Sequence, residues 1–149
     1  MHLQEQDFLM RQIQILTQLL QQIIFKKNQN QYQEAVEEIQ NALTKLTKDH
    51  PKAFHQLDFE ETLELFTHND TFESELAVAV ADLLVEQGKL LYEESFKRSQ
   101  KSMGQALILY KKSLQIPDAS VPLDIKNKIH HLENKVLADH LEQINSIFN

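Results

Sequence analysis

The chain has 149 residues, of which 42% are hydrophobic and 25% charged, as in one folded domain (residues 1–149) rather than a disordered segment. Its formal charge of −7 opposes binding to nucleic acid or anionic lipid, because both partners require a basic surface. The chain has no cysteine, which excludes disulfides, thiolate nucleophiles and cysteine-ligated metals.

Helix formers dominate the sequence, and only two glycines and three prolines interrupt them. The composition therefore predicts an all-α protein. Residues 1–7 include acids where a signal peptide carries bases. No run of apolar residues reaches the eighteen that indicate a membrane-spanning helix. We therefore expect a cytoplasmic protein that does not insert into a membrane.

The N-terminal third is predicted to form a pair of antiparallel helices within residues 1–50. Apolar residues recur at steps of three and four from Gln4 to Lys27 and again from Gln31 to Thr47. The short polar segment 28–30 separates the two patterns, which favours a hairpin. Small residues at Ala35 and Ala42 lie on the apolar face of the second helix and allow a neighbouring helix to approach closely.

The middle of the chain is predicted to hold a short helix and a longer one. Asp58 and Glu61 have the spacing of a capping box, which indicates a helix over 58–66 within the segment 57–67. Asp70 and Glu73 repeat that spacing and predict a long helix over 71–95. Gly88 inside it costs about 1 kcal/mol relative to alanine, so we expect either close backbone packing or a local break there.

The C-terminal part completes a prediction of about six helices. Residues 96–102 are interpreted as a basic linker, and a helix follows from Lys101 to Gln115, so that 71–116 form a second hairpin. Pro122 suits the first turn of a capping helix or helices over 121–148. The apolar stripe of this segment shifts by one residue midway, which predicts a kink or break near Asn134.

Both hairpins resemble tetratricopeptide repeats, which combine a large residue early in the first helix with a small-aromatic-small pattern in the second. The first hairpin offers Leu19, then Ala35, Ile39 and Ala42, although Ile23 stands where a small residue is usual. The second, more degenerate hairpin offers Gly88, then Ala106, Tyr110 and Ser113, with about six extra residues between its helices. The resemblance implies antiparallel helix hairpins in a short right-handed stack or bundle.

A wider resemblance covers most of the chain. Residues 7–13, 32–43 and 83–91 look like a family of uncharacterised bacterial proteins with tetratricopeptide-like helices. That family has no assigned activity. The resemblance therefore implies the fold and transfers no functional residues.

The seven histidines raise the hypothesis of a metal-dependent hydrolase. His130 precedes Glu133 by three residues and Glu64 precedes His68 by four, but no Glu-x-x-His or His-x-x-x-His element occurs. Around the short helix, acids gather near two histidines, either as an acid/base group or as helix caps: Asp58, Glu60, Glu61 and Glu64 with His55 and His68. Capping and solvation are the favoured interpretation of both groups. We predict no catalytic residues, no metal site and no cofactor.

The sequence favours a non-enzymatic helical module that binds a protein or peptide through a groove. Its alternative is a structural homodimer without a groove ligand, since the terminal helices are richly apolar. In tetratricopeptide-like stacks the first helix of each hairpin lines the concave side. We therefore name five candidate partner-binding residues on those helices: Gln12, Gln22, Lys26, Glu86 and Lys89.

Overall fold

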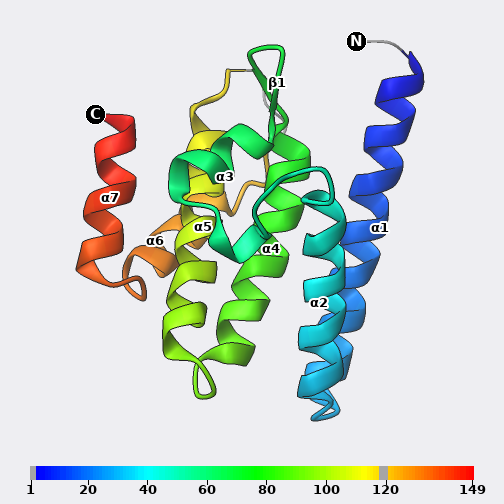
Figure 1. Cartoon of the computed structure of the whole chain (residues 1–149), viewed down its shortest axis with the longest axis vertical. Coiled ribbons are helices and arrows are strands. Elements are labelled where there is room, and N and C mark those ends of the chain that lie inside the picture. Colours follow the sequence, from blue (N-terminus) through cyan, green and yellow to red (C-terminus); the bar gives the residue numbers. More distant parts are fainter. Residues whose placement is uncertain (1–2, 118–120) are drawn as a thin grey trace.

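The protein is a bundle of helices that carries one small β-hairpin (Figure 1). The structure, a computed structural model, describes residues 3–117 and 121–149. Over those ranges it has seven α-helices, one more than the sequence indicated. The elements are α1 (Leu3–Asn28), α2 (Tyr32–Leu46), the 3-10 turn η1 (Phe54–Gln56), α3 (Phe59–Leu65), β1 (Thr67–His68), β2 (Thr71–Phe72), α4 (Ser74–Leu91), α5 (Phe96–Gln115), α6 (Ile125–Glu133) and α7 (Ala138–Phe148). No helix in the described ranges is long and apolar enough to cross a membrane.

Helices α1 and α2 pack side by side and run in opposite directions (Figure 1). Each begins and ends within one residue of its expected bounds. The turn between them closes through Asn30, whose φ is 60°, and through a 2.8 Å hydrogen bond from the Gln31 N–H to the Lys26 carbonyl. Ile23, Ala35 and Ile39 are fully buried where this pair meets the rest of the core.

The most extensive helix contact joins α4 and α5, at the centre of the molecule. Gly88 confirms the expected close packing, because a Cβ there would lie 2.6 Å from Met103 Cγ on α5. Helix α4 continues through this glycine without a break. The predicted basic linker over 96–102 is wrong: α5 already begins at Phe96, and only residues 92–95 connect the two helices. The six extra residues assigned to that connection are therefore part of a helix.

A two-stranded hairpin stands where the long helix was expected to begin. Thr67 pairs with Phe72 and His68 with Thr71, and the turn residues Asn69 and Asp70 have φ values of 52° and 63°. Two consecutive left-handed residues are typical of a type I′ turn, which Asn and Asp tolerate. The capping role predicted for Asp70 is therefore wrong, and α4 begins at Ser74 instead of Thr71.

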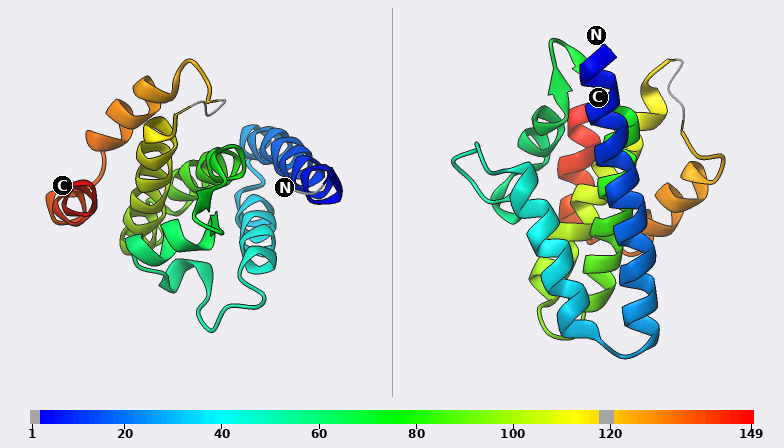
Figure 2. Two further views of the ribbon diagram at one scale, coloured as in Figure 1. Left: turned by 90° about the horizontal axis from the view of Figure 1, so that it is seen from above. Right: turned by 90° about the vertical axis from the view of Figure 1, so that its right-hand side faces the viewer.

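The predicted break near Asn134 is confirmed, since α6 ends at Glu133 and α7 begins at Ala138. A buried glutamine of α5 fixes the connection: Gln100 donates to the Lys135 carbonyl at 3.0 Å and accepts from the Leu137 N–H at 2.8 Å. Helix α6 packs on α5, whereas α7 packs on both α5 and α3. Seen from above, α4 and α5 therefore lie between α1 on one side and α6 on the other (Figure 2).

Candidate functional site

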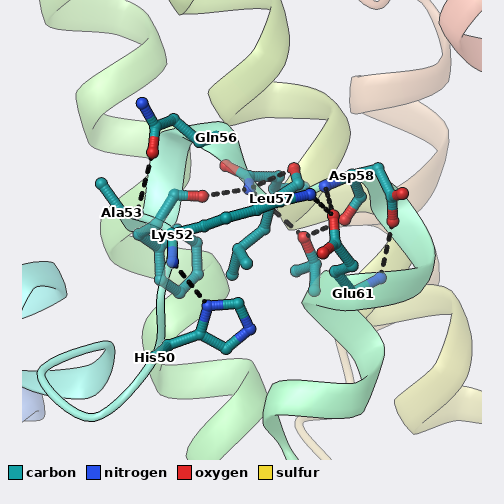
Figure 3. A network of polar contacts seen from close by, with 10 residues as sticks. His50, Lys52, Ala53, Gln56, Leu57, Asp58 and Glu61 are labelled. Atoms are coloured by element: carbon teal, nitrogen blue, oxygen red, sulfur yellow. Dashed lines mark hydrogen bonds and ion pairs between the residues drawn. The ribbon is translucent and has the colours of Figure 1, made fainter.

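Two of the acidic residues around α3, Asp58 and Glu61, cap this helix (Figure 3). Asp58 accepts a hydrogen bond from the Glu61 N–H at 2.7 Å, and the Glu61 carboxylate accepts from the Asp58 N–H at 3.0 Å. This reciprocal pair confirms the capping box predicted from the sequence. Lys52 lies 2.8 Å from the same Glu61 carboxylate. The hydrogen bond from the Asp58 N–H, and after it the Lys52 ammonium, lower the pKa of the Glu61 carboxyl.

Behind the capping box, a buried side chain ties this segment to α5. Gln105 is 1% exposed, and its amide donates to the Phe54 carbonyl at 2.9 Å and to Thr62 Oγ1 at 3.2 Å. The nearby His55 has its pKa lowered by burial first and then by the positive charges of Arg98 and Lys101. No group of three or more acidic or histidine side chains in the described ranges has the arrangement of a metal site.

A hollow of about 440 Å³ opens between α1, α4 and α6. Its apolar lining comes from all three helices: Leu20 and Ile24 of α1, Val85 of α4 and Leu132 of α6. Its polar lining adds Asp82, Glu86, Lys89, Asn127, Lys128 and His131, with Tyr110 from α5. The hollow thus combines an apolar lining with several polar and charged side chains, as ligand sites do.

The charged groups at one end of this hollow are already paired with one another. The Tyr110 hydroxyl donates to Asp82, and Lys128 lies 3.1 Å from the same carboxylate. The Lys128 ammonium also sits 5.7 Å from the centre of the Tyr110 ring. Burial, and then the negative charge of Asp82, raise the pKa of Tyr110. The tyrosine is therefore a neutral hydrogen-bond donor, which makes it unsuited to act as a base.

Glu86 organises the middle of the hollow. Its residue is 8% exposed, and its carboxylate lies 3.0 Å from Lys27 of α1 and 3.5 Å from Lys89 on its own helix. The pair with Lys27 joins α1 to α4. A buried carboxylate with two cations is satisfied within the fold, so Glu86 offers a partner little free charge.

A second hollow of about 1110 Å³ adjoins the first, and Lys89 lines both. Its lining holds three aromatic side chains that are 43–53% exposed, namely Tyr32, Tyr92 and Phe96. The rings of Tyr92 and Phe96 meet edge to face at 5.3 Å. Leu90, Met103 and Leu137 supply further apolar surface. We call the two hollows together the α1–α6 groove.

Two of the five candidate partner-binding residues line this groove, Glu86 and Lys89. The other three lie elsewhere. Lys26 turns toward α2, where it pairs with Glu38 and lies 3.5 Å from Glu34. Gln12 lines a separate hollow of about 710 Å³ beside the β-hairpin. Gln22 is exposed and lines none of these three hollows.

The aromatic residues of the groove were not among those candidates. Tyr32 begins α2, Tyr92 follows α4 and Phe96 begins α5, so all three lie at helix ends. Their signal in the sequence is a large aromatic side chain beside a turn. Tyr92 and Phe96 lie outside the apolar stripes, whereas Tyr32 precedes Ala35 by three residues on the apolar face of its helix. No family model, no curated protein and no solved structure matches this chain.

Proposed function

We propose that this protein is a non-enzymatic helical module that binds a peptide segment of another protein in the α1–α6 groove. The observation that carries the proposal is a groove with the apolar lining of three helices at one end and three exposed aromatic side chains at the other. Exposed aromatic residues beside apolar surface are frequent anchors of protein interfaces.

In the first hollow, the internal pairing of the carboxylates supports an apolar ligand segment over a charged one. Asp82 is held by Tyr110 and Lys128, while Glu86 is held by Lys27 and Lys89. A charged ligand group would have to displace one of these cations or hydrogen bonds. An apolar side chain gains by covering the apolar lining, at roughly 25 cal/mol per Å² of apolar surface removed from water. We infer that the bound segment inserts apolar residues into the first hollow, whereas the second also presents Glu93, Glu94 and Lys135.

A tetratricopeptide-like arrangement is part of the same proposal. In it, α1–α2 and α4–α5 are two hairpins, and the helices within residues 121–148 cap the stack. Two contacts support this assignment, because α2 packs on α4, as the second helix of one repeat packs on the first helix of the next, and α6 packs on α5. The first hollow of the groove is lined mainly by α1, α4 and α6. The insertion of α3 and the β-hairpin between the first two pairs departs from the repeat.

Peptide selection from a random display library, with the intact chain as bait, tests this function. Selected peptides should bind in the groove, so Ile24→Glu and Tyr92→Ala should each weaken them by at least about tenfold. Both side chains are partly exposed at 39% and 53%, so we expect both variants to fold. Gln21→Glu is the matched control, since Gln21 is an exposed residue of α1 that lines neither hollow. Selected peptides that bind all three variants like the parent, or no selected peptide at all, would contradict the proposal.

A further inference from the structure

The outer face of α1 carries large apolar side chains that nothing in the described protein covers. Phe8, Ile15 and Phe25 are 69%, 64% and 64% exposed. Arg11, Gln18 and Gln22 are also exposed and complete a stripe with alternating steps of three and four residues. This is the spacing of the contact seam of a two-helix coiled coil. Figure 2 shows α1 at the edge of the molecule, with α2 and α4 on its inner side.

The charge content of this helix is unlike that of the rest of the protein. Residues 8–25 contain a single charged side chain, Arg11, although charged residues make up 25% of the chain. A helix that faces water normally carries charges on its outer side. Depletion of charge around exposed aromatic residues is instead typical of the core of a protein interface.

We propose that a second copy of this chain covers the stripe, with the two α1 helices packed antiparallel about a two-fold axis. A second copy is the proposed partner because the order of the side chains along the stripe lets two antiparallel copies match each other. In one register, Phe8 faces Phe25 of the second copy and Ile15 faces its Gln18. The same register places Arg11 opposite Gln22 of the second copy, so no like charges meet. A parallel pair would place the two Arg11 side chains against each other, which is unfavourable.

This interface is separate from the α1–α6 groove. Leu20 and Ile24, the α1 residues of the first hollow, lie on the opposite side of the helix from the stripe. A dimer built on the stripe therefore leaves both grooves open. The proposal consequently stands or fails independently of peptide binding, and a dimer would present two grooves to a partner.

Sedimentation velocity over a range of concentrations tests the dimer. The parent chain should pass from monomer to dimer as its concentration rises to the high micromolar range. Phe8→Ser combined with Phe25→Ser should raise the dissociation constant at least about tenfold, because the change removes both outer apolar layers. Met10→Ser is the matched control, since Met10 is 57% exposed on the same helix but lies off the stripe. A parent chain that remains monomeric, or a double variant that dimerises like the control, would overturn the proposal.

Disulfide trapping tests the antiparallel register, and the absence of native cysteine makes the readout unambiguous. Arg11→Cys and Gln22→Cys chains should cross-link efficiently when mixed and oxidised, and poorly when each is alone. Along α1 the two positions are about 16 Å apart, so identical cysteines in an antiparallel pair lie beyond disulfide reach. Efficient cross-linking of the Arg11→Cys chain alone would indicate a parallel pair and overturn the register.

Discussion

His140 of α7 lies in an environment that disfavours its charged form. Its ring meets the ring of Phe59 edge to face at 5.6 Å, and its Nδ1 is buried without a hydrogen-bond partner in the described structure. Lys101 sits 5.7 Å from the centre of the same Phe59 ring. Burial first, and then the positive charge of Lys101, lower the pKa of His140 below its usual 6.5, while Asp139 opposes the shift.

This depressed pKa makes stability depend on pH. As the pH drops below about 6.5, His140 takes up a proton more readily in the unfolded chain than in the folded protein. Lowering the pH therefore lowers the free energy of unfolding, until the pH is below the pKa of His140 in the folded protein. His140→Leu should therefore lose less stability than the parent between about pH 7.5 and about pH 5.5. Urea unfolding at both pH values measures the difference. His130→Leu, at an exposed position of α6, is the control. An equal loss in His140→Leu and the parent would contradict this account.

At the scale of elements, the sequence predicts best where one face of a helix meets a continuous core. Helices α1 and α2 and the capping box of α3 follow from apolar spacing and from Asp58. The start of α5 was missed because the basic and polar run 97–101 was interpreted as a linker, and its serines Ser99 and Ser102 gave no sign of core packing. Their hydroxyls instead donate to the Gly88 and Leu84 carbonyls of α4, contacts that no local pattern contains. The β-hairpin was missed because Asp70 resembles a helix cap until its left-handed backbone is known.

The break between α6 and α7 depends on one buried side chain of α5. Gln100 is 2% exposed and pairs with the Lys135 carbonyl and the Leu137 N–H. Gln100→Ala would remove both hydrogen bonds, each worth roughly 0.5–1.5 kcal/mol. We therefore expect Gln100→Ala to lower the free energy of unfolding by about 1–3 kcal/mol and to speed hydrogen exchange at the Leu137 amide.

Chemical denaturation measures the first effect of Gln100→Ala, and amide exchange measures the second. Gln115→Ala is the matched control, because Gln115 is an exposed residue at the end of the same helix. Equal stability of the Gln100 and Gln115 variants would show that water or a backbone shift replaces the glutamine.

At the scale of the whole molecule, the groove depends on how distant segments are placed. Ile24, Val85 and Leu132 lie on three different helices, and each has the spacing of an ordinary core residue. The resemblance to tetratricopeptide repeats implied that the first helix of each hairpin lines a concave face, which predicted Glu86 and Lys89 as groove residues. The sequence could not indicate that Lys27 neutralises Glu86, because that pairing depends on where α1 crosses α4, whereas Lys89 lies three residues from Glu86 on the same helix. Nor could it show that Tyr32, Tyr92 and Phe96 gather at one end.

The last two helices also complete the core, and this leads to a prediction about the whole chain. Five apolar side chains from residues 121–149 are at most 8% exposed: Ile125, Ile129, Leu132, Val136 and Ile144. Without them, the faces of α5 and α3 on which α6 and α7 pack would be exposed to water. A typical domain has a net stability of only about 5–15 kcal/mol, which leaves little margin for such a loss. A chain ending at Pro117 should therefore lose cooperative unfolding and bind a dye specific for exposed apolar surface.

Two substitutions in the full-length chain, one at a buried position and one at an exposed position, test whether burial in this region stabilises the protein. Ile129→Ala should lower the free energy of unfolding by about 2–5 kcal/mol, because it leaves a cavity against α5. Leu123→Ala should have almost no effect, since Leu123 is fully exposed at 104%. Thermal and urea unfolding followed by circular dichroism give both values. If the shortened chain unfolds cooperatively at the parent's urea midpoint, then α6 and α7 do not stabilise the core. The α6 side of the α1–α6 groove would then not be held in place by the core.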